Sequence, residues 1–372
     1  MRIAIDGRYL QDHFPGIARY TYNLVENLAD MVDEEIILYH NPRLANTRYD
    51  AGRLQRKGKI DLRTLNVATF SIWEQLSLPV TLHQDRVQVF HSPYYLKPYF
   101  QPGRSVVSIH DLISAVYPEH LPSRRSRALF EIATRLALAS AARIITLSES
   151  SKKDLVRIFG AKQEKVTVTY LAADARFCPR DREALAPVRE RYGLPDRYIL
   201  YVGINKPHKN LARLIEAFAS LRRASAISLV IAGKEDRRHP QARAAAQRSS
   251  AADRIIFLEG FSDDDLPYIY NLAEAFVFPS LYEGFGLPPL EAMASGVPVI
   301  SSNRSSLPEV VGNAALTVDP KDVTAMAEAM SGVLEDERLR DELRSRGIER
   351  ATAFSWRETA RQTLAVYQEA MR

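Results

Sequence analysis

The sequence has 372 residues, of which 46% are hydrophobic and 26% are charged, and its formal net charge is +5. This length exceeds what one hydrophobic core usually organises, so we expect two domains. The only cysteine, Cys178, excludes an internal disulfide framework and fits a reducing compartment. No catalytic motif surrounds Cys178, and we interpret it as a residue without a catalytic role.

The first residues, "MRIAID", form a strand-like run without the features of a secretory leader. No apolar run approaches the roughly 20 residues of a membrane span. We therefore expect a cytoplasmic protein. The positive charge is compatible with several anionic partners, but the arginines are scattered and no basic stripe carries interleaved aromatics, so we expect no nucleic-acid partner.

Strand-like and helix-like runs alternate through the first half of the chain. The helix-like run after the first strand places Ile17, Tyr20, Leu24 and Leu28 on one face. The predicted strands are "MRIAID", "EIILYH", "IDLRTLN", "VQVFHSP", "RSVVSIHD" and "ARIITLSES", and this half ends near "KVTVTYLAAD".

One predicted helix of this half, within residues 122–144, begins with Arg124, Arg125 and Arg127. It is either a core helix with a solvated start or a surface helix that contacts anionic lipid at the inner face of the membrane.

The second half repeats the alternation after a linker and a short helix at 173–196. A helix is predicted at 210–223, with apolar positions 211, 214, 215 and 218. The predicted strands are "RYILYVG", "ISLVIAG", "RIIFLEG", "AFVFPS", "VPVISS" and "AALTVD", and beyond Asp319 the chain is predicted to be helical. The pattern predicts two doubly wound, Rossmann-like α/β domains, at 1–172 and 173–356, which face each other across a cleft that holds the ligand.

Glu283 and Glu291 flank the segment "GFGLPPL". Its glycines favour a loop, and its prolines suit the first turn of a helix that Gly296 ends. A helix N-terminus binds anions, and carboxylates accept hydrogen bonds from hydroxyls. The arrangement therefore fits a nucleoside diphosphate sugar, although a dipole-stabilising Glu291 and a surface Glu283 would give the same spacing.

Further candidate residues follow predicted strands. In "YVGINKPHKNL", Gly203 ends a strand, and Lys206 and Lys209 precede a helix, where a lysine can neutralise a diphosphate. Gly16 precedes a helix, where backbone can approach phosphate. His110 ends a strand, where it either bonds a substrate hydroxyl or has a structural role.

Two features suggest a metal but have simpler interpretations. The three aspartates of "FSDDDLPYIYNLA" precede a helix that Ser262 or Asp263 would cap. His91 has no partner at metal-ligand spacing, and no zinc motif is present. We therefore expect no metal and no other cofactor.

Together these segments resemble the retaining GT-B glycosyltransferases of family 4, the group that includes bacterial mannosyltransferases for surface polysaccharides. The resemblance spans nearly the full length, and its most specific element is the E-x7-E pair, Glu283 and Glu291. The other matching segments, in the family's order, are "FPGIARYTYNLVENLA", "SIHDLISAVYPEH", "ARIITLSESSKKDL" and "YVGINKPHKNLARLIEAF".

The resemblance implies roles for these residues. Glu291 would bond the ribose hydroxyls, Glu283 would hold the donor sugar, and Lys209 would neutralise the diphosphate. His110 would lie beside the sugar, and Gly16 would approach the diphosphate. The N–H groups of Phe285, Gly286 and Leu287 would hold sugar hydroxyls and phosphate. Many relatives carry Arg where this chain has Ile204, so Lys206 is the weaker cationic candidate. The last helix, 357–372, would pack back on the first domain.

The implied reaction moves a hexose, with mannose from GDP-mannose as the leading donor, to an acceptor hydroxyl with retention and without a metal. The acceptor would be a saccharide or a lipid-linked saccharide. The alternatives are a UDP-glucose-dependent glucosyltransferase of the same family, a sugar-nucleotide epimerase on a GT-B fold, and a non-catalytic binder.

Overall fold

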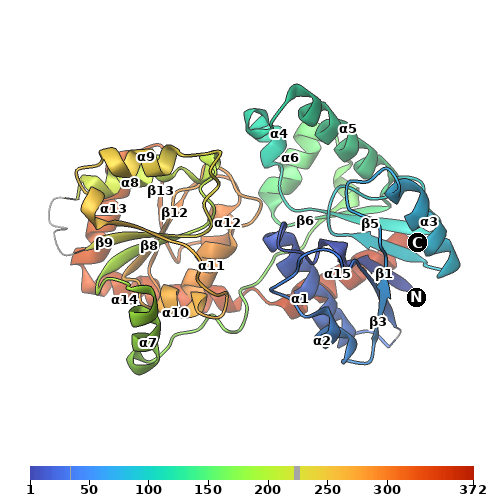
Figure 1. Ribbon diagram of the computed structural model, residues 1–372, viewed down its shortest axis with the longest axis horizontal. Coiled ribbons are helices and arrows are strands. Elements are labelled where there is room, and N and C mark those ends of the chain that lie inside the picture. The colour runs from blue at the N-terminus through green and yellow to red at the C-terminus, as the bar shows by residue number, and fades with distance from the viewer. Residues whose placement is uncertain (34, 222–226) are drawn as a thin grey trace. The chain divides into compact units, whose positions relative to one another are not determined.

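Figure 1 shows the computed structural model of the chain, which describes residues 1–33, 35–221 and 227–372. The chain divides into two compact units, which are Met1–Leu171 with Ser355–Arg372 and Ala172–Phe354. Each unit is built on one parallel β-sheet with helices packed around it. The predicted α/β class and its doubly wound sheets are therefore confirmed. No helix among the described residues is both long enough and apolar enough to cross a membrane.

The first unit contains a seven-stranded sheet in the order β3-β2-β1-β4-β5-β6-β7. Its strands are β1 (Ile3–Asp6), β2 (Ile36–His40), β3 (Ile60–Thr64), β4 (Val89–Ser92), β5 (Arg104–Ile109), β6 (Arg143–Thr146) and β7 (Val166–Val168). Its helices are α1 (Pro15–Ala29), α2 (Ala51–Gln55), α3 (Glu74–Gln84), α4 (Ile113–Val116), α5 (Arg124–Ser140), α6 (Glu149–Phe159) and α15 (Trp356–Met371).

The second unit contains a six-stranded sheet in the order β10-β9-β8-β11-β12-β13. Its strands are β8 (Tyr198–Val202), β9 (Ser228–Ala232), β10 (Ile255–Leu258), β11 (Ala275–Phe278), β12 (Val299–Ser302) and β13 (Leu316–Val318). Its helices are α7 (Arg182–Tyr192), α8 (Leu211–Ala219), α9 (Gln241–Arg248), α10 (Leu266–Asn271), α11 (Leu287–Ala294), α12 (Leu307–Val311), α13 (Val323–Glu335) and α14 (Glu337–Thr352).

The strand order locates the ligand edge of each sheet. In a doubly wound sheet, ligands bind at the carboxyl ends of the strands where the order reverses. The reversal lies between β1 and β4 in the first unit and between β8 and β11 in the second. The strands at these positions are almost wholly buried, as expected for a parallel sheet covered on both faces.

The predicted helix at 210–223 is α8, which begins at Leu211 and ends at Ala219; residues 222 and 223 lie outside the described residues. Its four predicted apolar positions are all buried. The capping prediction for the aspartate run was wrong in detail. Asp265 is the residue that precedes α10, and Ser262 accepts a hydrogen bond from the Asp265 N–H instead of capping the helix itself.

A chain of buried polar groups ties four elements of the first unit together. The Tyr20 hydroxyl on α1 hydrogen-bonds the Ser108 hydroxyl on β5 at 3.0 Å, and Ser108 bonds His91 Nε2 on β4 at 2.8 Å. His91 Nδ1 bonds the Tyr367 hydroxyl on α15 at 2.6 Å. This network joins α15 to the sheet, and Figure 1 shows α15 beside α1. His91 therefore has a structural place in the core.

Burial gives His91 a pH-dependent role in stability. Its side chain is fully buried, and desolvation lowers its pKa to about 3, with a smaller contribution from His110. The ordinary pKa of about 6.5 applies in the unfolded chain, so neutral His91 stabilises the fold above that pH. This contribution is lost progressively as the pH falls from about 6.5 toward the folded pKa.

We therefore expect the free energy of unfolding to decrease between pH 7 and pH 4. The variant His91→Gln should be less stable at pH 7 but should show a weaker pH dependence. Denaturant unfolding at four pH values measures both quantities. His83→Gln, at an exposed histidine of α3, is the control and should keep the parent's slope. An unchanged slope in His91→Gln would contradict the assignment.

Candidate active site

An ion pair lies where the strand order of the second unit reverses. The turn Pro207–Lys209 follows β8, and the loop that carries Glu283 follows β11. Lys209 Nζ lies 2.6 Å from Glu283 Oε1, and the two side chains are 16% and 11% exposed. The same ammonium lies 5.1 Å from the centre of the Phe278 ring, a cation–π distance. The structure thus brings two of the predicted site residues into direct contact.

The loop after β12 holds the backbone of Glu283. The Ser305 hydroxyl accepts a hydrogen bond from the Glu283 N–H at 3.1 Å and donates to the Glu283 carbonyl at 2.5 Å. The Ser306 hydroxyl lies within 3.0 Å of the same carbonyl and 2.7 Å from the carbonyl of Phe285. These contacts hold the backbone between β11 and α11 in place. The Glu283 side chain therefore extends from a fixed point of the backbone.

The segment that carries Lys209 is also held by hydrogen bonds to backbone carbonyls. Asn210 adopts a left-handed conformation with φ of 61°, and its amide donates to the carbonyls of Pro279 and Pro320 at 3.1 and 2.6 Å. The Leu281 N–H donates to the His208 carbonyl at 2.8 Å. The two loops that carry the ion pair are therefore bonded to each other through the backbone.

The start of α11 has the predicted form. Gly286 precedes the helix with φ of 118°, and an added Cβ would lie 2.6 Å from Leu307 Cδ2, so only glycine fits. Pro288 and Pro289 occupy the first turn. The first N–H groups of a helix have no partner within it, so this end can hold an anion.

Glu291 lies inside α11 and is only 2% exposed. Its Oε2 accepts a hydrogen bond from the Tyr270 hydroxyl at 3.0 Å. Tyr270 comes from α10 and is fully buried, so one oxygen of the carboxylate is held by the core. The structure thus places Glu283 before the helix and Glu291 within it.

Gly203 and Lys206 have different surroundings from the ion pair. An added Cβ at Gly203, where φ is 150°, would lie 2.7 Å from the Tyr201 hydroxyl oxygen, and one at Gly233 would lie 2.3 Å from the Gly203 carbonyl oxygen. Backbone conformation and local packing therefore favour glycine at both positions. The Lys206 side chain is exposed, and Lys206 precedes the turn that ends at Lys209.

His110 follows β5 in the first unit. Its Nε2 is buried and has no hydrogen-bond partner among the residues that the structure describes. Burial lowers the His110 pKa to about 4, against a smaller opposing effect of a hydrogen bond to the Pro93 backbone. The ring of Tyr20 lies edge-on at 4.8 Å. The imidazole is therefore neutral at pH 7 and retains one nitrogen for a hydrogen bond.

Gly16 is the second residue of α1, and an added Cβ there would meet no atom within 4 Å. Packing within the unit therefore does not require a glycine at this position. Sequence reasoning missed the aromatic cluster in front of it, in which the Phe14 ring lies 5.6 to 5.8 Å from three others. These rings belong to Tyr9, Phe70 and Tyr94. Phe70 and Tyr94 are so distant from Phe14 in the sequence that no local pattern relates them.

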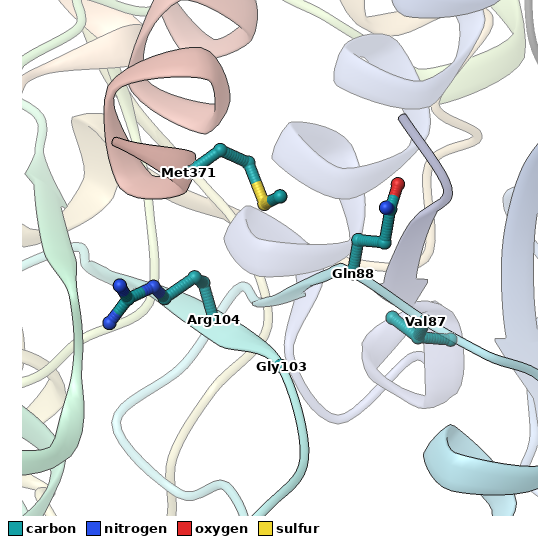
Figure 2. Close-up of a pocket in the computed structure, with 5 residues that line it drawn as sticks. All are labelled: Val87, Gln88, Gly103, Arg104 and Met371. Carbon is teal, nitrogen blue, oxygen red and sulfur yellow. The ribbon is translucent and has the colours of Figure 1, made fainter.

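Two other features are not part of this site. Among the described residues, no group of three or more His, Cys, Asp or Glu could hold a metal ion, and Asp265 instead accepts hydrogen bonds from Arg191 and Tyr192. A pocket of about 400 Å³ in the first unit is lined by Gln88, Arg104 and Met371, among others (Figure 2). It lies at the amino ends of β4 and β5, away from the ligand edge of the sheet.

Comparisons with known proteins agree with this geometry. The family described as "Glycosyltransferase Family 4" matches residues 15–177, and "Glycosyl transferases group 1" matches residues 185–350. The chain is 32% identical to the O-antigen chain mannosyltransferase B of Escherichia coli over 366 residues, which cover 95% of this chain and 96% of that protein.

Two solved structures share the fold. Sucrose-phosphate synthase from Thermosynechococcus elongatus has a TM-score of 0.79 at 20% identity and covers 99% of this chain and 98% of its own. Anabaena Alr3699/HepE, solved in complex with UDP and glucose, has a TM-score of 0.77 at 19% identity and covers 98% of each chain. The two parallel-sheet units therefore have the GT-B fold, and the matching family models and the full-length relative show that the chain is a glycosyltransferase. Within that class, the chain belongs to glycosyltransferase family 4.

Substitutions at Lys209 and at Glu291 should affect different kinetic quantities. Lys209→Ala should lower the rate of transfer, because it removes the cation at the site, and Glu291→Ala should mainly weaken donor binding. Loss of one charged hydrogen bond costs about 1.5–3 kcal/mol, which corresponds to roughly 10- to 150-fold. Steady-state kinetics and nucleotide titration of both variants measure these effects.

Lys234→Ala is the matched control, because Lys234 is an exposed lysine that follows β9 in the same sheet. It should behave as the parent. If Lys209→Ala and Glu291→Ala both fold and retain full transfer activity, the assignment of this site is wrong.

Proposed function

We propose that this glycosyltransferase moves mannose from GDP-mannose to an acceptor hydroxyl during polysaccharide or glycolipid synthesis, with retention of the anomeric configuration and without a metal. The Lys209–Glu283 ion pair beside the start of α11 carries the proposal, because it puts a cation, a hydroxyl acceptor and a helix N-terminus in one loop region. The name of the E. coli relative supports mannose as the sugar and an O-antigen chain as the kind of product.

In this proposal the residues of the second unit divide the donor among them. Glu291 bonds the ribose hydroxyls, Glu283 bonds the sugar, and the N–H groups of Phe285, Gly286 and Leu287 hold sugar hydroxyls and phosphate. The Lys209 ammonium has three donor hydrogens, so it can keep its bond to Glu283 while it contacts the diphosphate. It would then stabilise the negative charge that develops on the leaving group.

The first unit supplies uncharged groups in the same proposal. Neutral His110 lies beside the sugar with its unpartnered Nε2 directed to a hydroxyl, and the open backbone at Gly16 approaches the diphosphate. Lys206 and Gly203 complete the donor-binding residues. Lys206 is exposed and would add a second positive charge for the diphosphate.

The nucleotide can be identified directly. We expect GDP to stabilise the protein in a thermal-shift measurement more than UDP or ADP at equal concentration. At 100 times its dissociation constant, a ligand adds roughly 2.7 kcal/mol to the free energy of unfolding. Transfer from GDP-mannose should persist in EDTA, and NMR of the product should show the anomeric configuration of the donor.

A larger shift with UDP, together with transfer from UDP-glucose, would replace mannose by glucose in the proposal. Loss of activity in EDTA that Mg²⁺ restores would contradict metal independence. Release of an isomerised sugar nucleotide without any acceptor would instead indicate an epimerase.

We further propose that α5 places the enzyme at an anionic membrane surface at the cytoplasmic face, where a lipid-linked acceptor would be found. Its first turn carries Arg124, Arg125 and Arg127. The helix then exposes three large apolar side chains, Leu129 (57%), Ile132 (56%) and Leu136 (43%). Their spacing puts them on one face, and a basic start followed by an exposed apolar stripe is typical of a helix that lies in the membrane interface.

Vesicle flotation tests this contact. The protein should bind vesicles with 30% phosphatidylglycerol and not vesicles of pure phosphatidylcholine, and Arg124→Gln/Arg125→Gln should weaken binding by about tenfold or more, because each arginine near such a surface contributes about 1 kcal/mol. Arg237→Gln/Arg338→Gln removes the same charge from exposed positions of the second unit and should bind as the parent. Equal losses in both variants would exclude a specific role of α5.

A further inference from the structure

A second polar pocket lies in the second unit, at the end of α11 that is opposite to Gly286. It has a volume of about 500 Å³ and is bordered by α7, α10, α11 and α14, which Figure 1 shows gathered on one side of the sheet. Ser295, which follows the last residue of α11, lines this pocket. The volume lies in the range of small-molecule sites, which is roughly 300–1,000 Å³.

The charge of the lining is one-sided. Three arginines, Arg180, Arg189 and Arg344, line the pocket, and no aspartate or glutamate is among the described residues that do so. Asp196, which pairs with Arg189 at 3.2 Å, is 92% exposed and lies outside the lining. Such a pocket attracts an anion, and guanidinium groups match phosphate in geometry.

Several polar atoms of the pocket have no partner. The Nε atoms of Arg180 and Arg189 are buried without a hydrogen bond to any described residue. The Ser295 hydroxyl is also unpartnered, and Ser295 is only 3% exposed. A buried polar group without a hydrogen-bond partner destabilises the folded protein. Such groups on the wall of a pocket therefore indicate a polar ligand that would bond them.

The arginines are held in place by the surrounding structure. The Arg180 N–H donates to Asn271 Oδ1 at 2.8 Å, and the Arg180 guanidinium stacks on the Tyr268 ring at 4.3 Å. Asn271 Nδ2 also bonds the Cys178 carbonyl, which ties this loop to α10. Arg344 Nε donates to the Gly296 carbonyl at 2.9 Å and so compensates the negative end of α11.

We propose that this pocket is a second ligand site, distinct from the candidate nucleotide site, which binds a phosphate monoester of the size of a sugar phosphate. Three guanidinium groups and a serine hydroxyl hold the phosphoryl oxygens. The apolar side chains of Leu185 and Ile348 in the same lining cover the remainder of the ligand. Ser295 lies four residues after Glu291, so the ligand contacts the helix that carries the candidate nucleotide site.

Isothermal titration of the intact protein with glucose 6-phosphate and with inorganic phosphate tests the proposal. Glucose 6-phosphate should bind saturably and more weakly as salt rises, whereas glucose should not bind. Arg180→Gln/Arg189→Gln should weaken binding by about tenfold or more, and Ser295→Ala should weaken it by less. Lys209→Ala should bind the probe as the parent does, because Lys209 lies at the other site.

Arg191→Gln is the matched control, since Arg191 lies on α7 near Arg189 but pairs with Asp265 outside the pocket. Ser295→Ala removes no charge, so it covers the case in which the arginine variant does not fold. The proposal is overturned if neither phosphate probe binds or if glucose binds equally well. It is also overturned if Lys209→Ala abolishes binding while Ser295→Ala and the pocket arginine variant retain it. That result would place the probe at the candidate nucleotide site and would not contradict the proposed transfer activity.

Discussion

The contact between Lys209 and Glu283 is the interaction on which the candidate active site depends. It joins the loop after β8 to the loop after β11, the two strands between which the sheet order reverses. Both side chains are largely buried, so removal of either leaves a charge poorly solvated. The serines after β12 and the amide of Asn210 support this contact, and the start of α11 is placed relative to it.

The two units use one topology with different electrostatics. The ligand edge of the second unit carries a partly buried ion pair and a helix start, and that of the first carries a neutral imidazole. Burial explains the difference, because desolvation disfavours the charged form of His110, whereas Lys209 and Glu283 solvate each other.

Arginines form two basic regions outside the candidate active site. Those of α5 lie beside an exposed apolar stripe, and those around Ser295 line a pocket without acidic side chains among its described residues. The net charge of the chain is only +5, so these two basic regions come from the local grouping of arginines and not from a large overall charge. Scattered arginines in the sequence gave no sign that Arg180 and Arg344, which are 164 positions apart, line one pocket.

The sequence by itself determined the alternation of strands and helices, the loop at Gly286 and the position of Glu283 before α11, because these follow from local periodicity and from the backbone preferences of glycine and proline. It did not determine the partners of these residues. The bond of Tyr270 to Glu291, the place of His91 between Ser108 and Tyr367, and the aromatic cluster at Phe14 arise only when elements that are separated in the sequence pack together. Tertiary structure decides such contacts because they depend on which elements pack together, and no local pattern encodes that choice.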